Sequence, residues 1–189
     1  MQEPDREWRS ARLVQLTVGG GEGRRQDDEY AEFVAVISHL HNQETVEDAG
    51  LRLAEVKSIT ERLQATLQSN PRAAAVFATD FNCCRRQDYN DREWSLIAQM
   101  KSNMKEAEVE ADGVAEELQR QGFVCAYGAH APVLTHWTST TVDFAYFLQP
   151  QSGRWRWSAG GSYVVSPKDS DPLSDHCLVV HDFILVRGV

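Results

Sequence analysis

Three groups of acidic, amide and imidazole side chains adjoin apolar stretches of the sequence, where a strand could hold them in fixed positions. Asp80 and Asn82 follow one apolar stretch, Asp143 lies inside another, and Ser174-Asp175-His176 precedes a third. Side chains two residues apart on an extended segment point the same way, so Asp80 and Asn82 would present a carboxylate and an amide to one point. The spacing therefore predicts a small polar site at the end of a strand.

The other two groups predict proton transfer or metal ligation. Burying an unpaired carboxylate is costly, so Asp143 is expected to face a partner such as a histidine or a cation. A carboxylate beside an imidazole, as at Asp175 and His176, can hold a metal or move a proton. Each group taken alone is better explained as a turn or a surface segment. Together, each attached to an apolar strand, they favour a functional site.

The elements that must position these groups alternate between strands and helices. Apolar or alternating stretches predict strands at 11–18, 33–38, 73–78, 123–127, 140–148, 154–157, 163–165 and 177–186. Apolar residues three, four and seven apart predict a helix from Val46 that stops at Asn70-Pro71. A second helix is expected from about Trp94 to Gln121, with Gly122 as its C-terminal cap. This order predicts an α/β class, a layered domain with helices packed on sheets.

The composition fits one packed, acidic domain. The 189 residues are 42% hydrophobic and 25% charged, which is too apolar for a disordered chain, and the net charge is −9. A chain this acidic needs a local basic patch or a bridging cation to bind a polyanion. No apolar run is long enough to span a membrane, and the polar first ten residues exclude a secretory signal peptide, so an intracellular protein is expected.

Several other polar residues are expected to be structural. The four cysteines have no spacing typical of a disulfide framework or a zinc site, and nothing activates Cys83 or Cys84 as a nucleophile. His130 and His136 flank Pro132 in a loop, where surface placement is favoured over substrate contact. These residues are therefore left outside the predicted site.

Four segments, in order, resemble motifs of the endonuclease/exonuclease/phosphatase superfamily, which includes deoxyribonuclease-like nucleases. Residues 75–82 are similar to the family's apolar strand that ends in Gly-Asp-Phe-Asn, with Thr79 in place of the usual glycine. Residues 142–147 resemble its Asp-Tyr-Ile strand, 172–176 match its terminal Ser-Asp-His, and 36–40 resemble its strand ending in His-Leu. The resemblance covers residues 11 to 187 and implies a layered α/β sandwich in a single, partial domain over residues 1–189.

The resemblance also implies a role for each matching residue. Asp80 and Asn82 would orient the attacking water and hold phosphate oxygens. His176 would contact the scissile phosphate or move a proton, and Asp143 would pair with His176 and fix its tautomer. His39 would lie near the phosphate. These five residues form the expected catalytic set.

A divalent cation is the implied cofactor. Asp175 would help ligate it, with Mg²⁺ the usual ion and Mn²⁺ the alternative. A cation and aligned donors relieve the repulsion between a nucleophile and a phosphodiester. Mg²⁺ prefers oxygen ligands and keeps waters, so few protein ligands suffice. It also bridges an acidic protein to a polyanion, so the charge of −9 does not exclude nucleic acid as a substrate.

One departure from the family bears on function. Its members have a preceding half that contains a Gln-Glu whose Glu is the main metal ligand, and only Gln2-Glu3 superficially resembles that dipeptide here. The expectation is an N-terminally truncated form, either with weakened metal binding or completed by another chain or segment. The favoured function is a magnesium-dependent phosphoesterase that acts on a phosphodiester. The alternatives are a phosphomonoesterase for nucleotide or inositol phosphates, and a catalytically impaired remnant that serves as a binding or scaffold module.

Overall fold

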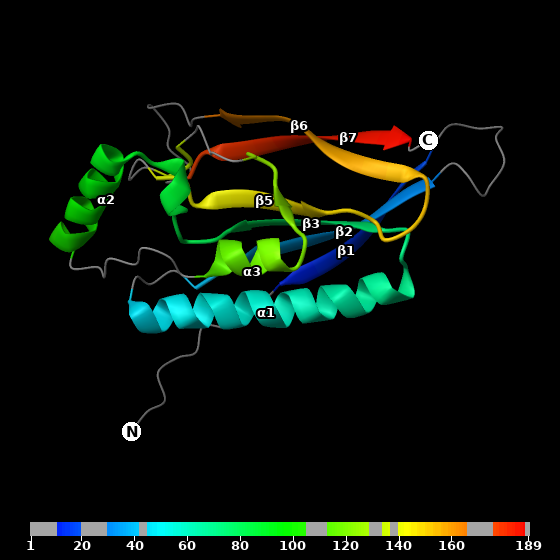
Figure 1. Ribbon diagram of the computed structural model, residues 1–189, viewed down its shortest axis with the longest axis horizontal. Helices are drawn as coiled ribbons and strands as arrows, with labels where there is room; N and C mark the ends of the chain where they lie inside the picture. Colours follow the sequence, from blue (N-terminus) through cyan, green and yellow to red (C-terminus); the bar gives the residue numbers. More distant parts are fainter. Residues whose placement is uncertain are drawn as a thin grey trace, which may run out of the picture.

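The computed structural model describes residues 11–19, 30–41, 45–104, 113–128, 134–136, 140–165 and 176–187. Its elements, in chain order, are β1 (Arg12–Gly19), β2 (Tyr30–His39), α1 (Val46–Ser69), β3 (Ala74–Asp80), the 3₁₀ turn η1 (Arg86–Asp88), α2 (Asp91–Asn103), α3 (Val114–Arg120), β4 (Val124–Cys125), β5 (Asp143–Leu148), β6 (Trp155–Val165) and β7 (Leu178–Arg187). Helices α1 and α3 cover one face of a sheet, and the β6–β7 ribbon lies on the other (Figure 1). The expected layered α/β class is confirmed.

The five-stranded sheet has the order β1-β2-β3-β5-β4. Strands β2 and β3 run parallel, joined by α1 as the crossover, while the other neighbouring pairs are antiparallel. The register sets His39 opposite Asp80 and Asp80 opposite Asp143. Because directly opposite residues share a face of the sheet, the register alone brings three of the predicted site residues together.

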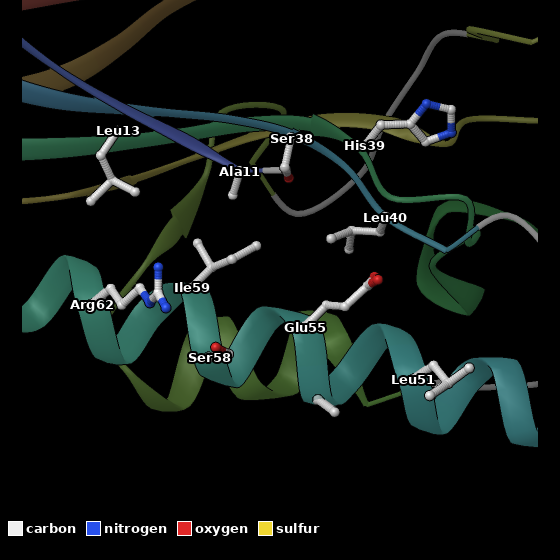
Figure 2. Close-up of a pocket in the computed structure, with 11 residues that line it drawn as sticks. Ala11, Leu13, Ser38, His39, Leu40, Leu51, Glu55, Ser58, Ile59 and Arg62 are labelled. Carbon is white, nitrogen blue, oxygen red and sulfur yellow. The ribbon is translucent and has the colours of Figure 1, made fainter. Parts of the chain in front are cut away.

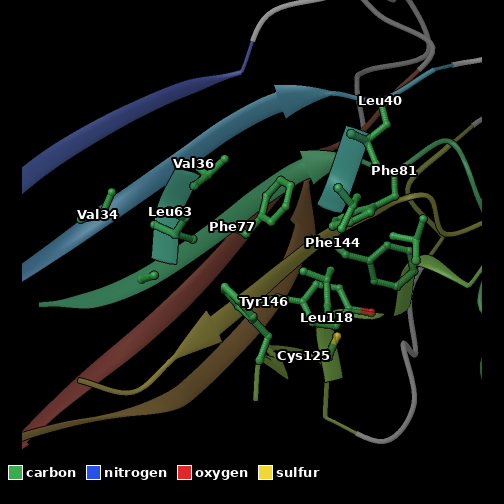
Figure 3. Packing of buried hydrophobic residues seen from close by; sticks show 14 of the residues in the cluster. Val34, Val36, Leu40, Leu63, Phe77, Phe81, Leu118, Cys125, Phe144 and Tyr146 are labelled. Carbon is green, nitrogen blue, oxygen red and sulfur yellow. The ribbon is translucent and has the colours of Figure 1, made fainter. Parts of the chain in front are cut away.

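Helix α1 begins at a capping box and buries one apolar face. The side chain of Thr45 accepts a hydrogen bond from the backbone N–H of Asp48, whose carboxylate in turn accepts from the backbone N–H of Thr45. The buried residues Val56, Leu63 and Leu67 then pack in one core cluster with the sheet (Figure 3). This packing fixes β2 and β3 side by side, and with them the strand ends that carry His39 and Asp80.

Leu63→Ala tests this packing. Leu63 has no exposed surface, so its truncation should lower the free energy of unfolding by about 2–5 kcal/mol in urea denaturation followed by circular dichroism. The matched control is Leu51→Ala on the exposed face of the same helix, which should change the free energy by less than about 0.5 kcal/mol. Equal losses in the two variants would contradict the described packing of α1.

An aromatic cluster lies directly behind the strand ends. The buried ring of Phe81 has its centroid 5.6 Å from Phe77, 5.8 Å from Phe144 and 5.5 Å from Tyr146 (Figure 3). The pairs with Phe144 and Tyr146 are edge-to-face, an arrangement that holds rings in defined orientations. Phe81 directly follows Asp80, and Phe144 directly follows Asp143, so the cluster fixes the backbone at both carboxylates.

The helical region after η1 differs from the expected single helix over residues 94–121. The structure contains α2 and α3 as separate helices, with residues 105–112 outside the described part. Helix α3 begins after Gly113, whose φ of 76° is a left-handed conformation that suits glycine. The expected C-terminal cap is confirmed, because Gly122 has a φ of 87° and the N–H of Phe123 donates to the carbonyl of Leu118. No helix in the described ranges is both long and apolar enough to cross a membrane.

The β6–β7 ribbon packs on the sheet through three ring contacts. Centroid distances are 5.4 Å for Phe33 and Trp157, 5.7 Å for Phe147 and Phe183, and 4.7 Å for Tyr127 and His181. The sequence predicted two strands, 154–157 and 163–165, where the structure has one. Strand β6 continues through a glycine pair, Gly160 and Gly161, at a register shift between Ala159 and Ser162. A Cβ on Gly160 would lie 3.1 Å from the carbonyl oxygen of Asp182, so a side chain there would crowd β7.

The stability of the fold is expected to depend on pH through His181, whose ring contacts Tyr127. Burial lowers the pKa of His181 below its ordinary value of 6.5, so the unfolded chain binds this proton more readily than the folded one. The free energy of unfolding should therefore fall as the pH drops below about 6.5. In urea denaturation between pH 7.5 and pH 5, the free energy of unfolding of His181→Gln should depend less steeply on pH than that of the unsubstituted protein. Identical slopes for the two proteins would contradict this assignment.

The ribbon leaves apolar surface uncovered on both layers. On its outer face Leu178, Ile184 and Val186 are exposed, Leu178 to 64%. On the edge strand β1, Val14 and Leu16 are also exposed. Within the described residues, a two-stranded layer thus covers only part of a five-stranded one.

Candidate active site

The site lies where two neighbouring strands end and two others begin. His39 and Asp80 are the last residues of β2 and β3, Asp143 is the first residue of β5, and His176 lies two residues before β7. Strand pairing gathers the first three side chains, and a hydrogen bond to Asp143 brings in His176, which lies 137 positions after His39. The sequence proposed this set, and the structure places these four side chains together.

His176 bridges the two carboxylates. Its Nδ1 lies 2.9 Å from Oδ2 of Asp143, at hydrogen-bond distance, and its Nε2 lies 3.5 Å from Oδ2 of Asp80. The side chains of Asp80, Asp143 and His176 are 13%, 20% and 26% exposed, so a small ligand can reach a group that is otherwise shielded. Because the carboxylate of Asp143 accepts a hydrogen bond from Nδ1–H, it favours the tautomer in which Nε2 carries no proton.

Asp80 is the electrostatic centre of the site. Burial raises the pKa of Asp80, and the nearby charge of Asp143 raises it further, although the backbone N–H of Asn82 and the imidazoles of His176 and His39 act in the opposite direction. The N–H of Asn82 donates to Oδ1 of Asp80 over 2.8 Å. The carboxylate of Asp80 is thus held in place by the backbone N–H of Asn82 and repelled by the carboxylate of Asp143.

Asn82 is placed differently from the simple alternation of a strand. Strand β3 ends at Asp80, and Asn82 has a φ of 50°, in the left-handed region. Its Nδ2 donates to the carbonyl of Leu40 over 2.9 Å, while the N–H of Leu40 donates to the carbonyl of Asp80 over 3.0 Å. Asn82 therefore ties the end of β2 to the end of β3, and a second amide hydrogen remains for another acceptor.

His39 borders the site from the open side. Its Nε2 lies 3.4 Å from Oδ2 of Asp80, and its side chain is 61% exposed. An imidazole in this position can contact an anionic ligand that approaches Asp80 from solvent. The two remaining sequence proposals, Asp175 and the Gln2-Glu3 dipeptide, lie outside the described residues.

The described residues fit a divalent cation. One ligand atom from each of Asp80, Asp143 and His176 lies within 4.8 Å of the others. Two carboxylates directly opposite each other in a sheet repel, and a bound cation would relieve that repulsion. Carboxylate oxygens suit Mg²⁺ and Mn²⁺, whereas an imidazole is a better ligand for zinc. Oxygen ligation by the two aspartates is the arrangement consistent with the hydrogen bond between His176 and Asp143.

Two residues at this site were missed or misplaced by sequence reasoning. Thr135 is buried beside Asp143, and His136, expected on the surface, is half-buried with its ring centroid 4.7 Å from that of His176. Residues 134–136 form only isolated bridges, to Thr140 and to His176, so they lack the periodicity of a strand. No local sequence signal identifies either residue.

A separate hollow of about 460 Å³ lies on the other side of β2, next to α1 (Figure 2). Its walls are mostly apolar or small, with Leu13, Leu40 and Ile59 among them, and Glu55 and Arg62 contribute the charges. His39 reaches its edge but points away from α1 in Figure 2. The hollow therefore does not bring the polar residues of the site together.

Comparison with known proteins relates this geometry to a fold. No protein-family model and no curated protein matches the sequence. The solved structure of the human Nocturnin catalytic domain with bound sulfate anion matches 93% of this chain and 60% of its own, at 16% identity and a TM-score of 0.55. The structure of truncated Caenorhabditis elegans TDP2 matches 94% of this chain and 60% of its own, at 15% identity and a TM-score of 0.48. The structure of an endonuclease/exonuclease/phosphatase family protein from Bacteroides thetaiotaomicron matches 91% of this chain and 62% of its own, at 11% identity and a TM-score of 0.43.

The match to Nocturnin extends over nearly the whole of this chain and decides its architecture. The chain has part of the endonuclease/exonuclease/phosphatase fold. The resemblance found in the sequence is thereby confirmed at the level of the fold. The chain spans about 60% of the length of the Nocturnin domain, so the endonuclease/exonuclease/phosphatase fold is represented here in part.

Asp80→Asn tests how costly the site is to this endonuclease/exonuclease/phosphatase fold. When the pKa of a carboxyl is raised in the folded state, the protein loses stability as the pH rises through that pKa. The neutral amide of Asp80→Asn removes this cost, so the free energy of unfolding at pH 7 should rise. Asn keeps an oxygen that can accept from Asn82. In metal-free urea denaturation the gain should shrink toward pH 4.

Asp88→Asn is the matched control for that substitution. Asp88 accepts two hydrogen bonds from the buried guanidinium of Arg85, at 2.8 and 2.7 Å. Removing one partner of a buried pair should destabilise the protein by about 3–5 kcal/mol at pH 7. A comparable loss in Asp80→Asn would show that Asp80 is a structural ion-pair residue.

Proposed function

We propose that the chain is a metal-dependent phosphoesterase that cleaves a phosphodiester by attack of water. The observation that carries the proposal is the arrangement of Asp143, His176 and Asp80, in which one imidazole lies between two carboxylates at a partly open edge of the sheet. Such an arrangement can orient an imidazole, hold a proton and bind a cation near a phosphate. The fold shared with the Nocturnin catalytic domain supports the proposal.

Each residue has a role that follows from its contacts. Asp143 holds Nδ1–H of His176, which leaves Nε2 to contact a phosphate oxygen or to carry a proton. Asp80 faces that Nε2 and can accept a hydrogen bond from the attacking water. Asn82 keeps Asp80 in place and can donate its second amide hydrogen to phosphate. The exposed His39 binds the anion from the solvent side.

The proposed cofactor is Mg²⁺, with Mn²⁺ as the alternative. Asp80 and Asp143 would hold it, together with Asp175, and when bound it neutralises charge on the phosphate. The chain itself is acidic, with a net charge of −9, so a bound cation would also favour the approach of a polyanionic substrate such as nucleic acid. A phosphomonoester of a nucleotide or inositol is the second substrate class.

A completing chain or segment is part of the proposal. The chain spans about 60% of the Nocturnin domain, and apolar side chains of β1, β6 and β7 are exposed. Exposed apolar surface of this kind is typical of a surface that another polypeptide covers. The same observations favour the second candidate function, a catalytically impaired remnant that acts as a binding or scaffold module.

The test is a titration with Mg²⁺ and Mn²⁺ in the presence of bis(p-nitrophenyl) phosphate or an oligonucleotide. Hydrolysis should require the cation, and His176→Ala and Asp143→Asn should each lower its rate at least about 100-fold while the protein stays folded. The control is Asp182→Asn, an exposed carboxylate on β7, which should leave the rate unchanged. No hydrolysis at millimolar cation would favour the binding module. Unchanged rates in either variant would remove that residue from the mechanism.

A further inference from the structure

Thr135 is a fully buried hydroxyl residue with an unusual set of partners. Its Oγ1 accepts hydrogen bonds from two successive backbone N–H groups, those of Val142 at 3.0 Å and Asp143 at 3.2 Å. Its exposed fraction is zero. These two N–H groups lead into β5, so the hydroxyl of Thr135 satisfies the backbone of the residue that carries the site carboxylate.

The backbone of Thr135 bonds to the segment that carries His176, the partner of Asp143. Its carbonyl accepts from the N–H of Cys177 over 2.8 Å, and Cys177 directly follows His176. The N–H of Thr135 donates to the carbonyl of Thr140 over 2.9 Å, which anchors Thr135 itself. One residue therefore bonds to the chain segments of both Asp143 and His176, which lie 33 positions apart.

The same connection reaches the third site residue. The carbonyl of Val142 accepts from the N–H of Phe81 over 2.8 Å, and Phe81 directly follows Asp80. Thr135 is thus linked through Val142 to the end of β3. A displacement of Val142 would therefore displace both Asp80 and Asp143.

The neighbouring residue completes the support of the imidazole. His136 bridges in antiparallel fashion to His176, and the planes of the two rings meet at 61°. The ring of His176 is thereby held by His136 in an edge-to-face contact and by Asp143 in a hydrogen bond. Residues 135 and 136 together restrain both the backbone and the ring of His176.

We propose that Thr135 is the positioning residue of this site, which uses its hydroxyl and its carbonyl to hold the Asp143–His176 pair in register. The expected effect of Thr135 on hydrolysis rests on the proposed function, whereas its expected effect on the geometry of the Asp143–His176 pair does not. Thr135 touches neither substrate nor cation in this proposal. It acts because a misplacement of about 1 Å between reacting groups can cost about 100-fold in rate.

The first experiment compares Thr135→Val with Thr135→Ser in the cation-dependent hydrolysis of bis(p-nitrophenyl) phosphate. Valine keeps the shape of threonine but cannot accept the two N–H groups, so kcat should fall about 100-fold and KM should stay within about threefold. Serine keeps the acceptor and should restore kcat to within about threefold of the original. Full activity in Thr135→Val, or equal loss in both variants, would overturn the proposal.

Thr60→Val controls for the loss of a buried hydroxyl in general. Thr60 is also fully buried, and its Oγ1 bonds to the carbonyl of Val56 at 2.8 Å and to the amide of Gln121 at 2.9 Å, on the helical layer. This variant should lose stability without a loss of kcat in the folded fraction. A loss of kcat as large as that of Thr135→Val would show that the effect is general destabilisation.

The second experiment measures the pair without any substrate. In proton NMR of ¹⁵N-labelled protein, the Nδ1–H of His176 bonded to Asp143 should give a downfield resonance, assigned by its absence in His176→Gln. The resonance should be lost in Thr135→Val and kept in Thr135→Ser. If Thr135→Val retains it, the proposal fails. If the resonance behaves as expected and the protein hydrolyses nothing, the proposed function fails and the positioning role of Thr135 stands.

Discussion

The last antiparallel pair of β3 and β5 sets two carboxylates, Asp80 and Asp143, directly opposite each other on one face of the sheet. Like charges in this relation destabilise a sheet, and partial burial increases the cost of each charge. His176 offsets the repulsion because one imidazole contacts both groups. A fold assembled for stability alone would place a neutral pair here. The surrounding architecture can therefore be understood as what keeps this unfavourable pair in place.

Support comes to the pair from several layers. The rings of Phe81 and Phe144 pack behind the two carboxylates, while Asn82 ties the ends of β2 and β3 together in front of that core. His176, by contrast, belongs to the segment that enters the β6–β7 ribbon. The ribbon is attached through ring contacts, through hydrogen bonds between Gln149 and Trp157, and through the bond from Cys177 to Thr135. The geometry of the site thus depends on how firmly the ribbon stays on the sheet. Further polypeptide over the exposed apolar face of the ribbon would stabilise the site without touching it.

Sequence reasoning succeeded where a residue and its setting are local. Asp80 and Asp143 could be found because each adjoins an apolar strand whose end determines its position, and His176 because an acid beside an imidazole is recognisable in itself. The register that places Asp80 between His39 and Asp143 is not local, and only the shared family pattern suggested it. Thr135 and His136 could not be found, because their roles depend on hydrogen bonds to strands that lie elsewhere in the sequence. The glycine pair in β6 misled the strand prediction because glycine commonly marks a turn, whereas here it lets two strands approach closely.

Thr79 shows why a departure from the family motif can leave the site intact. It stands where the resembling motif has glycine, immediately before Asp80, and is buried. Its hydroxyl accepts from Oγ of Ser38 over 2.9 Å and donates to the carbonyl of Ser38, the residue opposite it on β2. Successive side chains on a strand point to opposite faces, so Thr79 and Ser38 lie on the face away from Asp80 and His39. The substitution therefore adds a bond between β2 and β3 behind the site, and the face that carries the carboxylate is unchanged.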